Sequence, residues 1–179
     1  HPGVPVVRIG KPGGRVVVGL PAVRQPHTGD ATEAHPVGWL YTATLSGLAR
    51  STRYSYEIQC GALAGRTGSV ATTPQRGEPI TFVALGDSGR RHEDHRIVAT
   101  GITQVAPDLL VNSGDVVASG IPSDWRLFFE IERDLLASTP LFLAFGNHES
   151  IAGTELYEAY FPCEQPGPAG SRSCVRDFG

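Results

Sequence analysis

The chain has 179 residues, of which 40% are hydrophobic and 18% charged, and its formal net charge is −3. This composition excludes a disordered chain, and the lack of a basic excess argues against a dedicated nucleic-acid-binding protein. The 22 Gly and 14 Pro residues favour short strands and turns over a helical bundle, and no apolar run approaches the roughly 18–20 residues of a membrane-spanning helix.

The N-terminus does not have the features of a translated start. The chain begins His1-Pro2-Gly3 and contains no Met. It also lacks the basic and apolar segments of a signal peptide. We therefore expect the chain to be a processed or excised part of a longer protein.

Up to about residue 73 the sequence has the pattern of strands and turns. Short β-rich runs at 4–9 and 15–20 flank Lys11-Pro12-Gly13-Gly14, a strong turn signal. Residues 39–45 and 53–60 alternate with the period of two that is typical of half-buried strands. In the last run the expected buried face consists of Tyr54, Tyr56, Ile58 and Cys60. We predict a small β-sandwich over residues 1–73.

Residues 74–79 predict a linker, because they contain two prolines, a glycine and no apolar side chain. The pattern then changes to alternating strands and helices. Apolar runs at 80–85, 109–111 and 141–145 predict strands that are buried on both faces. Strands that alternate with helices predict βαβ units and a parallel sheet.

Two helices are predicted between these strands. The first covers residues 92–105, where Ile97, Val98, Ile102 and Val105 recur at helical spacing. The second is expected to run from Ser123, as its N-cap, to about Ala137. The side chains on its expected inner face are Trp125, Phe128, Phe129, Leu135 and Leu136.

Each of the three predicted strands ends in Gly followed by polar side chains. These ends read Gly86-Asp87-Ser88-Gly89, Asn112-Ser113-Gly114-Asp115 and Gly146-Asn147-His148-Glu149. Sites in parallel sheets form at the carboxyl ends of strands, and neighbouring strands are only about 4.8 Å apart. We therefore expect Asp87, Asp115 and Asn147 to converge. Carboxylates this close repel each other unless a cation lies between them, and oxygen and imidazole donors suit Zn, Mn or Fe.

These three motifs resemble the first three motifs of the calcineurin-like metallophosphoesterases. The Asp-x-Gly form at 87–89, the Gly-Asn-His-Glu form at 146–149 and the β-rich region in front resemble the purple acid phosphatase branch. Residues 45–56 resemble a fibronectin type III corner, in which a Tyr hydroxyl bonds back to the chain; the usual turn Pro is absent, and a generic hairpin is the alternative. The resemblance implies that residues 80–179 are the N-terminal half of a metallophosphoesterase α/β sandwich.

The resemblance also implies a dinuclear metal site and a role for each residue. Asp87 would bind the first metal, Asp115 would bridge both and Asn147 would bind the second. His148 would face the scissile phosphate, stabilising charge or protonating the leaving oxygen, and Glu149 is a weaker candidate for orienting His148. The implied reaction is hydrolysis of a phosphorylated small molecule or nucleotide, with a metal-bound hydroxide attacking phosphorus.

Two departures from the family pattern affect the metal ligands. The Tyr that follows the bridging Asp in purple acid phosphatases is Ala118 here, and the His that other phosphoesterases place after the first Asp is Gly89. One ligand of the first metal is thus unassigned, with His92 and His95 as candidates. The family's later motifs, Val-x-x-His and Gly-His-x-His, have no match, so we expect the remainder of the catalytic domain to complete the site.

Cys163 and Cys174 lie eleven residues apart in a Pro/Gly-rich stretch without zinc-knuckle spacing. One interpretation is a disulfide that closes this loop, and the other is two buried thiols. A disulfide would imply a secreted or periplasmic protein. Cys60 is then expected to be a small buried hydrophobe.

A function without catalysis stays open as an alternative. A fibronectin-like region joined to a degenerate α/β domain would serve adhesion or another interaction, and Ala118 and the missing histidines support this reading. An aspartyl-phosphate phosphatase is disfavoured because it needs Asp-x-Asp where the chain has Asp87-Ser88-Gly89. A nucleotide-binding domain is disfavoured because neither a G-x-G-x-x-G after a strand nor a P-loop is present.

Overall fold

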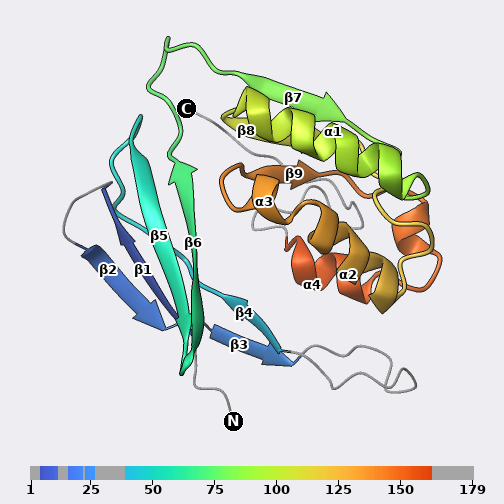
Figure 1. Cartoon of the computed structure of the whole chain (residues 1–179), viewed down its shortest axis with the longest axis horizontal. Coiled ribbons are helices and arrows are strands. Elements are labelled where there is room, and N and C mark those ends of the chain that lie inside the picture. The colour runs from blue at the N-terminus through green and yellow to red at the C-terminus, as the bar shows by residue number, and fades with distance from the viewer. Residues whose placement is uncertain (1–4, 12–15, 22, 27–38, 163–179) are drawn as a thin grey trace, which may run out of the picture.

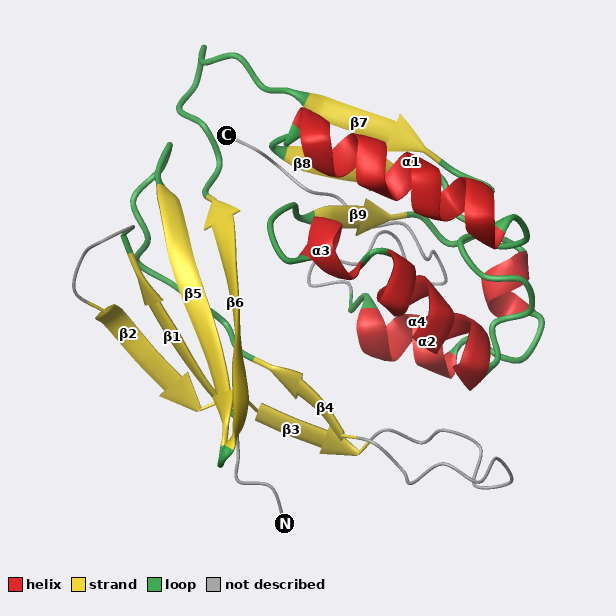
Figure 2. Cartoon of the chain, viewed as in Figure 1, coloured by secondary structure: helices red, strands yellow, loops and turns green. Residues whose placement is uncertain are grey.

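The computed structural model describes residues 5–11, 16–21, 23–26 and 39–162. The chain forms a β region followed by an α/β region (Figures 1 and 2). The β region contains β1 (Val6–Gly10), β2 (Val16–Pro21), β3 (Val23–Pro26), β4 (Trp39–Thr42), β5 (Arg53–Cys60) and β6 (Leu63–Ala71). The α/β region contains β7 (Phe82–Leu85), α1 (His92–Val105), β8 (Leu109–Asn112), α2 (Pro122–Ile131), α3 (Arg133–Leu136), β9 (Leu141–Leu143), the short 3-10 helix η1 (His148–Ser150) and α4 (Glu155–Tyr160).

The β region consists of antiparallel strands in two sheets, ordered β2-β1-β5-β6 and β3-β4. The bounds of β5 are those expected from the alternation, whereas β3 and β6 were not predicted, because neither run has alternating apolar residues. Tyr54 is buried, and its hydroxyl accepts a hydrogen bond from the Ala49 N–H at 3.0 Å. This is the contact that the fibronectin-like corner implies; membership of the fibronectin type III family stays a prediction.

The predicted inner face of β5 is correct only in part. Tyr54 is buried, Tyr56 and Cys60 are half-buried, and Ile58 is exposed. The register between β5 and β6 shifts between Ile58 and Cys60, and such an irregularity disturbs the alternation of side chains.

The α/β region is built on a parallel sheet in the order β7-β8-β9. Right-handed crossovers between strands in sequential order place the connecting helices on one face of the sheet. Val83, Leu85 and Leu141 accordingly pack against a buried cluster of Ile102, Leu110 and Leu135. On the opposite face, Phe82 is 59% and Val111 39% exposed. In the described part of the chain, the expectation of strands buried on both faces therefore fails at Phe82 and Val111, although Leu109 on the same face is buried.

Helix α1 has the predicted bounds but a different buried face. Its buried residues are His95, Ala99 and Ile102, whereas Ile97, Val98 and Val105 are exposed. The stripe is set by His95, whose Nε2 lies 2.6 Å from Oε1 of the buried Glu132. The buried face of α1 thus includes a polar pair, which apolar spacing alone did not reveal.

The second predicted helix is two helices, which meet at Glu132. Ser123 is not its N-cap: Ile121 holds that position and Pro122 is the first helical residue, a place that Pro favours. The predicted inner face is confirmed, because Trp125, Phe128 and Leu135 are buried and Phe129 and Leu136 are partly buried. Trp125 lies at the centre of an aromatic cluster with Phe128, Phe129, Tyr157, Tyr160 and Phe161.

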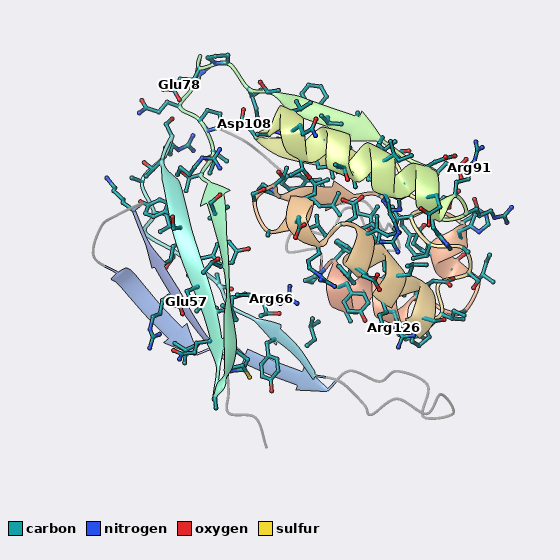
Figure 3. The ribbon with its side chains drawn as sticks, in the orientation of Figure 1. Glu57, Arg66, Glu78, Arg91, Asp108 and Arg126 are labelled. Atoms are coloured by element: carbon teal, nitrogen blue, oxygen red, sulfur yellow. The ribbon has the colours of Figure 1, made fainter. Side chains whose placement is uncertain are left out.

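The β and α/β regions meet at the C-terminal end of α3. The carbonyl oxygen of Ala137 accepts the Tyr56 hydroxyl at 2.9 Å and the Ser69 N–H at 3.0 Å. In the segment between the regions, the Glu78 carboxylate accepts the Gln75 N–H at 2.8 Å and the Ser51 hydroxyl (Figure 3). The hydrogen bond from Ser51, and to a smaller extent that from Gln75, lowers the pKa of Glu78. Within the described ranges, no helix is long and apolar enough to cross a lipid bilayer.

Candidate metal centre

The loops that follow the three parallel strands are bonded to each other through their backbones. The Asp87 N–H donates to the Gly114 carbonyl at 3.0 Å, and the Gly89 N–H donates to the Asp115 carbonyl at 2.9 Å. On the other side, the Ala144 N–H donates to the Asn112 carbonyl at 2.8 Å. The carboxyl ends of β7, β8 and β9 are thereby drawn together, as the sequence motifs predicted.

Both aspartates have a left-handed backbone, with φ of 56° at Asp87 and 57° at Asp115. Residues other than Gly adopt this conformation uncommonly, and it concentrates at functional sites. Gly114, which precedes Asp115, has a φ of 107°, and a Cβ there would lie 2.7 Å from the Gly146 nitrogen. A side chain at this position would push the loop after β8 away from the loop after β9.

The oxygen donors of Asp87, Asp115 and Asn147 fit part of a metal site. Oδ1 of Asp115 accepts the His148 N–H at 2.9 Å, which ties the second motif to the third. Within residues 39–162, the side chains of Asp87 and Asn147 have no hydrogen-bond partner in the structure and are exposed. Their oxygens are thus available to a cation that prefers oxygen ligands. No group of three His, Cys, Asp or Glu side chains that could hold a metal gathers in the described part of the chain.

The imidazole of His148 is oriented by a backbone carbonyl. Its Nδ1 lies 2.6 Å from the carbonyl oxygen of Ala118. Because a carbonyl oxygen can only accept, Nδ1 carries the proton of this bond, and Nε2 is the nitrogen left for other chemistry. Ala118 stands where the purple acid phosphatase pattern has a Tyr, so this position contributes through its backbone.

Glu149 makes contacts that the sequence did not suggest. Its side chain is 0% exposed, and its carboxylate accepts the N–H groups of Asp115 at 3.0 Å, Val116 at 2.8 Å and Gly146 at 2.8 Å. The structure thus gives the orienting contact of His148 to Ala118 rather than to Glu149. One signal was available: a Glu three residues after Gly146 has the spacing with which a side chain reaches back to the first N–H of a helical turn.

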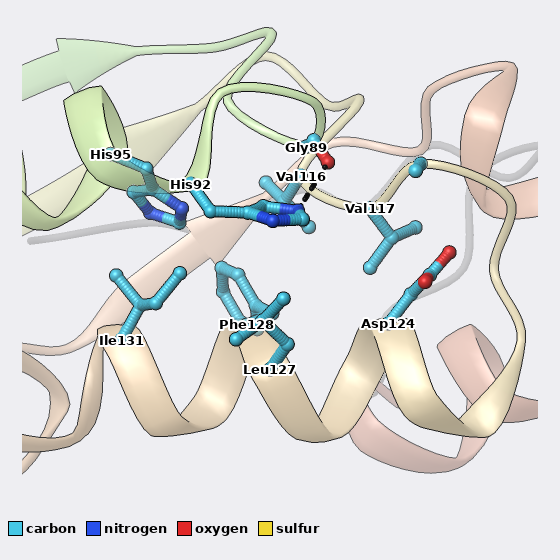
Figure 4. Close-up of a pocket in the computed structure, with 10 residues that line it drawn as sticks. Gly89, His92, His95, Val116, Val117, Asp124, Leu127, Phe128 and Ile131 are labelled. Atoms are coloured by element: carbon cyan, nitrogen blue, oxygen red, sulfur yellow. Dashed lines mark hydrogen bonds between the residues drawn. The ribbon is translucent and has the colours of Figure 1, made fainter.

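The two candidate histidines of α1 both line a small cavity between this helix and α2 (Figure 4). Nε2 of His92 lies 3.1 Å from the Gly89 carbonyl oxygen, at the edge of the first motif. His95 is buried against Glu132, and its ring stacks on Phe128 at 6.2 Å between ring centroids. The His95 ring is therefore engaged by Glu132, and ligand roles for His92 and His95 both stay predictions.

The cysteine pair cannot be placed in this arrangement, because Cys163 and Cys174 lie outside the described residues. The disulfide between them stays a prediction. Cys60 is half-buried rather than fully buried, close to the end of β5.

Comparison with solved structures found proteins of similar fold. The structure of the purple acid phosphatase PPD1 from yellow lupin (Lupinus luteus) seeds matches with a TM-score of 0.68 and 18% identity, over 97% of this chain and 33% of that one. A structure of PhoD matches with a TM-score of 0.49 and 17% identity, over 81% of this chain and 32% of that one. The chain thus spans about a third of the length of either protein. No curated protein sequence matches significantly.

The likeness to the lupin enzyme, at this level of identity, shows a shared fold. A family model extends the relationship to the sequence: the model described as calcineurin-like phosphoesterase matches residues 80–176, which is more than half of the chain. The matched segment contains all three strand-end motifs. The chain therefore belongs to the calcineurin-like phosphoesterase family.

Proposed function

We propose that the intact protein hydrolyses phosphate esters at a dinuclear metal centre that includes Asp87, Asp115 and Asn147. The observation that carries this proposal is the convergence of the three strand-end loops, in which Asp115 accepts the His148 N–H at 2.9 Å. Membership of the calcineurin-like phosphoesterase family supports the reaction class. The substrate class we propose is a phosphorylated small molecule or nucleotide.

The proposed ligands are those that the family resemblance implies. Asp87 would hold the first ion, Asp115 both ions and Asn147 the second; with imidazole donors supplied by the remainder of the domain, the set would suit Fe, Zn or Mn. When bound, such a pair of ions polarises the phosphoryl oxygens and activates water for in-line attack. The charge of the Asp115 carboxylate would offset the mutual repulsion of the ions.

His148 would act on the phosphate without binding metal. The Ala118 carbonyl holds its Nδ1–H, so Nε2 would either hold a proton for the leaving oxygen or stabilise phosphoryl charge. Either role needs a ring in a fixed orientation, because proton transfer requires heavy-atom separations near 3 Å. The 2.6 Å contact of Nδ1 supports such an orientation.

We further propose that additional polypeptide completes the centre and that the protein is exported to the periplasm or secreted. Two carboxylates and one amide are fewer ligands than two transition-metal ions need, since stable sites have three or four protein ligands each. The uncovered sheet face, where Phe82 is 59% exposed, offers a surface for the remainder of the catalytic domain.

The decisive experiment replaces Asp115 by Asn in the intact protein. Asn tolerates the left-handed φ of 57° and retains an oxygen for the His148 N–H, so the change removes charge with little effect on shape. We expect chelator-sensitive release of phosphate from nitrophenyl phosphate by the wild type, and loss of both activity and bound metal in the variant.

A matched control is Asp108→Asn, the same chemical change at the other end of the sheet. Oδ2 of Asp108 accepts the Thr81 N–H at 2.9 Å, close to the start of β7 (Figure 3). Metal content and turnover should stay at the wild-type level in this variant. A metal-loaded wild type that releases no phosphate from any ester would overturn the proposal and favour the non-catalytic interaction module.

A further inference from the structure

A buried carboxylate joins the two loops that carry Asp115 and Asn147. We propose that Glu149 is a positioning residue, which fixes the loop after β8 against the loop after β9 and so sets the separation of the metal ligands. It would act through backbone N–H groups, touching neither metal nor substrate. The consequence for metal affinity rests on the proposed function, whereas the contacts themselves are features of the fold.

The two carboxylate oxygens of Glu149 accept different N–H groups. Oε1 accepts the Val116 N–H at 2.8 Å, and Oε2 accepts both the Asp115 N–H at 3.0 Å and the Gly146 N–H at 2.8 Å. Oε2 therefore bridges the second and third motifs directly. Because the side chain is 0% exposed, water cannot take over these bonds when the carboxylate is removed.

The bonds act on a part of the backbone that is strained. Asp115 has a φ of 57°, an uncommon conformation that persists only where surrounding contacts enforce it. Hydrogen bonds to a charged acceptor are stronger than bonds between neutral groups, so a carboxylate enforces it better than an amide would. Two N–H groups in succession, at Asp115 and Val116, point to the same side chain.

The arrangement continues from Glu149 to His148. The backbone N–H of Asp115 is held by Glu149, Oδ1 of Asp115 accepts the His148 N–H at 2.9 Å, and the His148 ring contacts Ala118 at 2.6 Å. A shift of the loop after β8 would thus move the proposed bridging ligand and the His148 ring together. A carboxylate needed only for stability has no reason to contact both ligand loops.

Glu132 provides a matched control within the same region. It is also a buried carboxylate, 1% exposed, but its Oε1 contacts His95 and its Oε2 has no partner among the residues that the structure describes. Among the described residues, its carboxylate makes no hydrogen bond to either ligand loop. Glu132→Gln therefore measures the general effect of neutralising a buried carboxylate, and Glu149→Gln adds the weakening of the bonds to the two loops.

The test measures Co²⁺ affinity by titration, backbone amide proton shifts by NMR, and thermal stability, all on the intact protein. Gln has the shape of Glu, but its NH₂ group cannot accept, so at least one of the three bonds is lost. We expect Glu149→Gln to weaken Co²⁺ binding about 10–100-fold, the range for residues that support metal ligands from outside the coordination shell. The amide signals of Asp115, Val116 and Gly146 should move upfield. Glu132→Gln should change neither the Co²⁺ affinity nor these amide signals.

The outcomes separate this proposal from the proposed function. Co²⁺ binding at wild-type affinity by a folded Glu149→Gln would overturn the positioning role. If the wild type binds no Co²⁺, the metal centre itself is refuted, and the amide signals still report whether Glu149 holds the loops. If Glu149→Gln does not fold, Glu149→Asp replaces it: this variant keeps the charge, but its shorter side chain cannot span both loops. Wild-type Co²⁺ affinity in Glu149→Asp would equally overturn the proposal.

Discussion

Nδ1 of His148 lies 2.6 Å from the carbonyl oxygen of Ala118, a residue 30 positions earlier in the chain. This bond links the loop after β8 to the loop after β9 and selects the ring nitrogen that remains for chemistry. Since the acceptor is a backbone oxygen, the side chain at position 118 is not needed for the orientation. The replacement of the family's Tyr by Ala118 thus leaves the proposed function of His148 intact.

His148→Ala should lower turnover about 10²–10⁴-fold, the usual effect of losing a positioned acid or base. Bound metal should stay near the wild-type level, because the ring contacts Ala118 and is not a proposed ligand. Steady-state kinetics and elemental analysis on the intact protein measure both quantities. Loss of metal in His148→Ala would show instead that His148 is a ligand.

A series of leaving groups distinguishes the two possible roles of His148. If Nε2 donates a proton to the leaving oxygen, His148→Ala should lose little activity on nitrophenyl phosphate, whose leaving group needs no proton. It should lose far more on an alkyl phosphate. An equal loss on every ester would show that His148 stabilises phosphoryl charge rather than protonating the leaving group.

The contact between the β and α/β regions should be sensitive to a single methyl group. A Cβ at Gly68 would collide with the Ala137 carbonyl oxygen and the Tyr56 hydroxyl, which both lie against it. We expect Gly68→Ala to lower the free energy of unfolding by about 1–3 kcal/mol, as overpacking does. Urea unfolding measures the loss.

The control for Gly68→Ala is Gly101→Ala. Gly101 lies inside α1, and a Cβ there would meet nothing within 4 Å. Ala is the better helix former, so this change should raise the free energy of unfolding by about 0.5–1 kcal/mol. If Gly68→Ala had the same free energy of unfolding as the wild type, the contact at Ala137 would accommodate the added methyl group without loss of stability.

The location of the candidate site could be predicted because its residues directly follow strand ends. Asp87, Asp115 and Asn147 each follow a short apolar run, and the parallel order of the strands brings such ends together. In contrast, the role of Glu149 was missed: its spacing from Gly146 suggested one contact, but its other partners are backbone N–H groups of the distant loop after β8, which leave no mark on the sequence. Contacts of this kind depend on the loop conformation and appear only in three dimensions.

The errors in the fold have the same origin. Apolar spacing located α1 but not its buried face, since that face includes His95, which contacts Oε1 of Glu132 across the helix interface. The expectation of strands buried on both faces came from their continuous apolar runs, which do not say where the helices lie. Strands in sequential order place them on one side, and Phe82 lies on the other.

The loop between Cys163 and Cys174 supplies a test of the proposed export. If the protein is exported, these two cysteines should be bonded to each other, with a stabilisation of roughly 3 kcal/mol from restriction of the unfolded chain. Peptide mass mapping without reductant identifies the pairing. A bond from Cys60 to either partner would contradict it.

The decrease in the free energy of unfolding at alkaline pH should depend in part on Tyr157. Burial, and then the charge of Glu149, raise the pKa of Tyr157 above its ordinary value of 10.0. The folded protein therefore binds the phenolic proton more tightly than the unfolded chain does. This contribution to stability is fully present below pH 10 and is lost as the pH rises from there towards the folded-state pKa. Burial also raises the pKa of Tyr56 and Tyr160, which adds to the same trend.

Tyr157→Phe should flatten this alkaline decline without abolishing it. At neutral pH the variant should be less stable by about 0.5–1.5 kcal/mol, because the Tyr157 hydroxyl donates to the Leu143 carbonyl at 2.7 Å and that bond is lost. Urea unfolding at a series of pH values measures both effects. In Glu149→Gln, the ultraviolet titration of Tyr157 should shift to lower pH, because the charge that opposes phenolate formation is removed. An alkaline decline in Tyr157→Phe as steep as that of the wild type would assign the pH dependence to other groups.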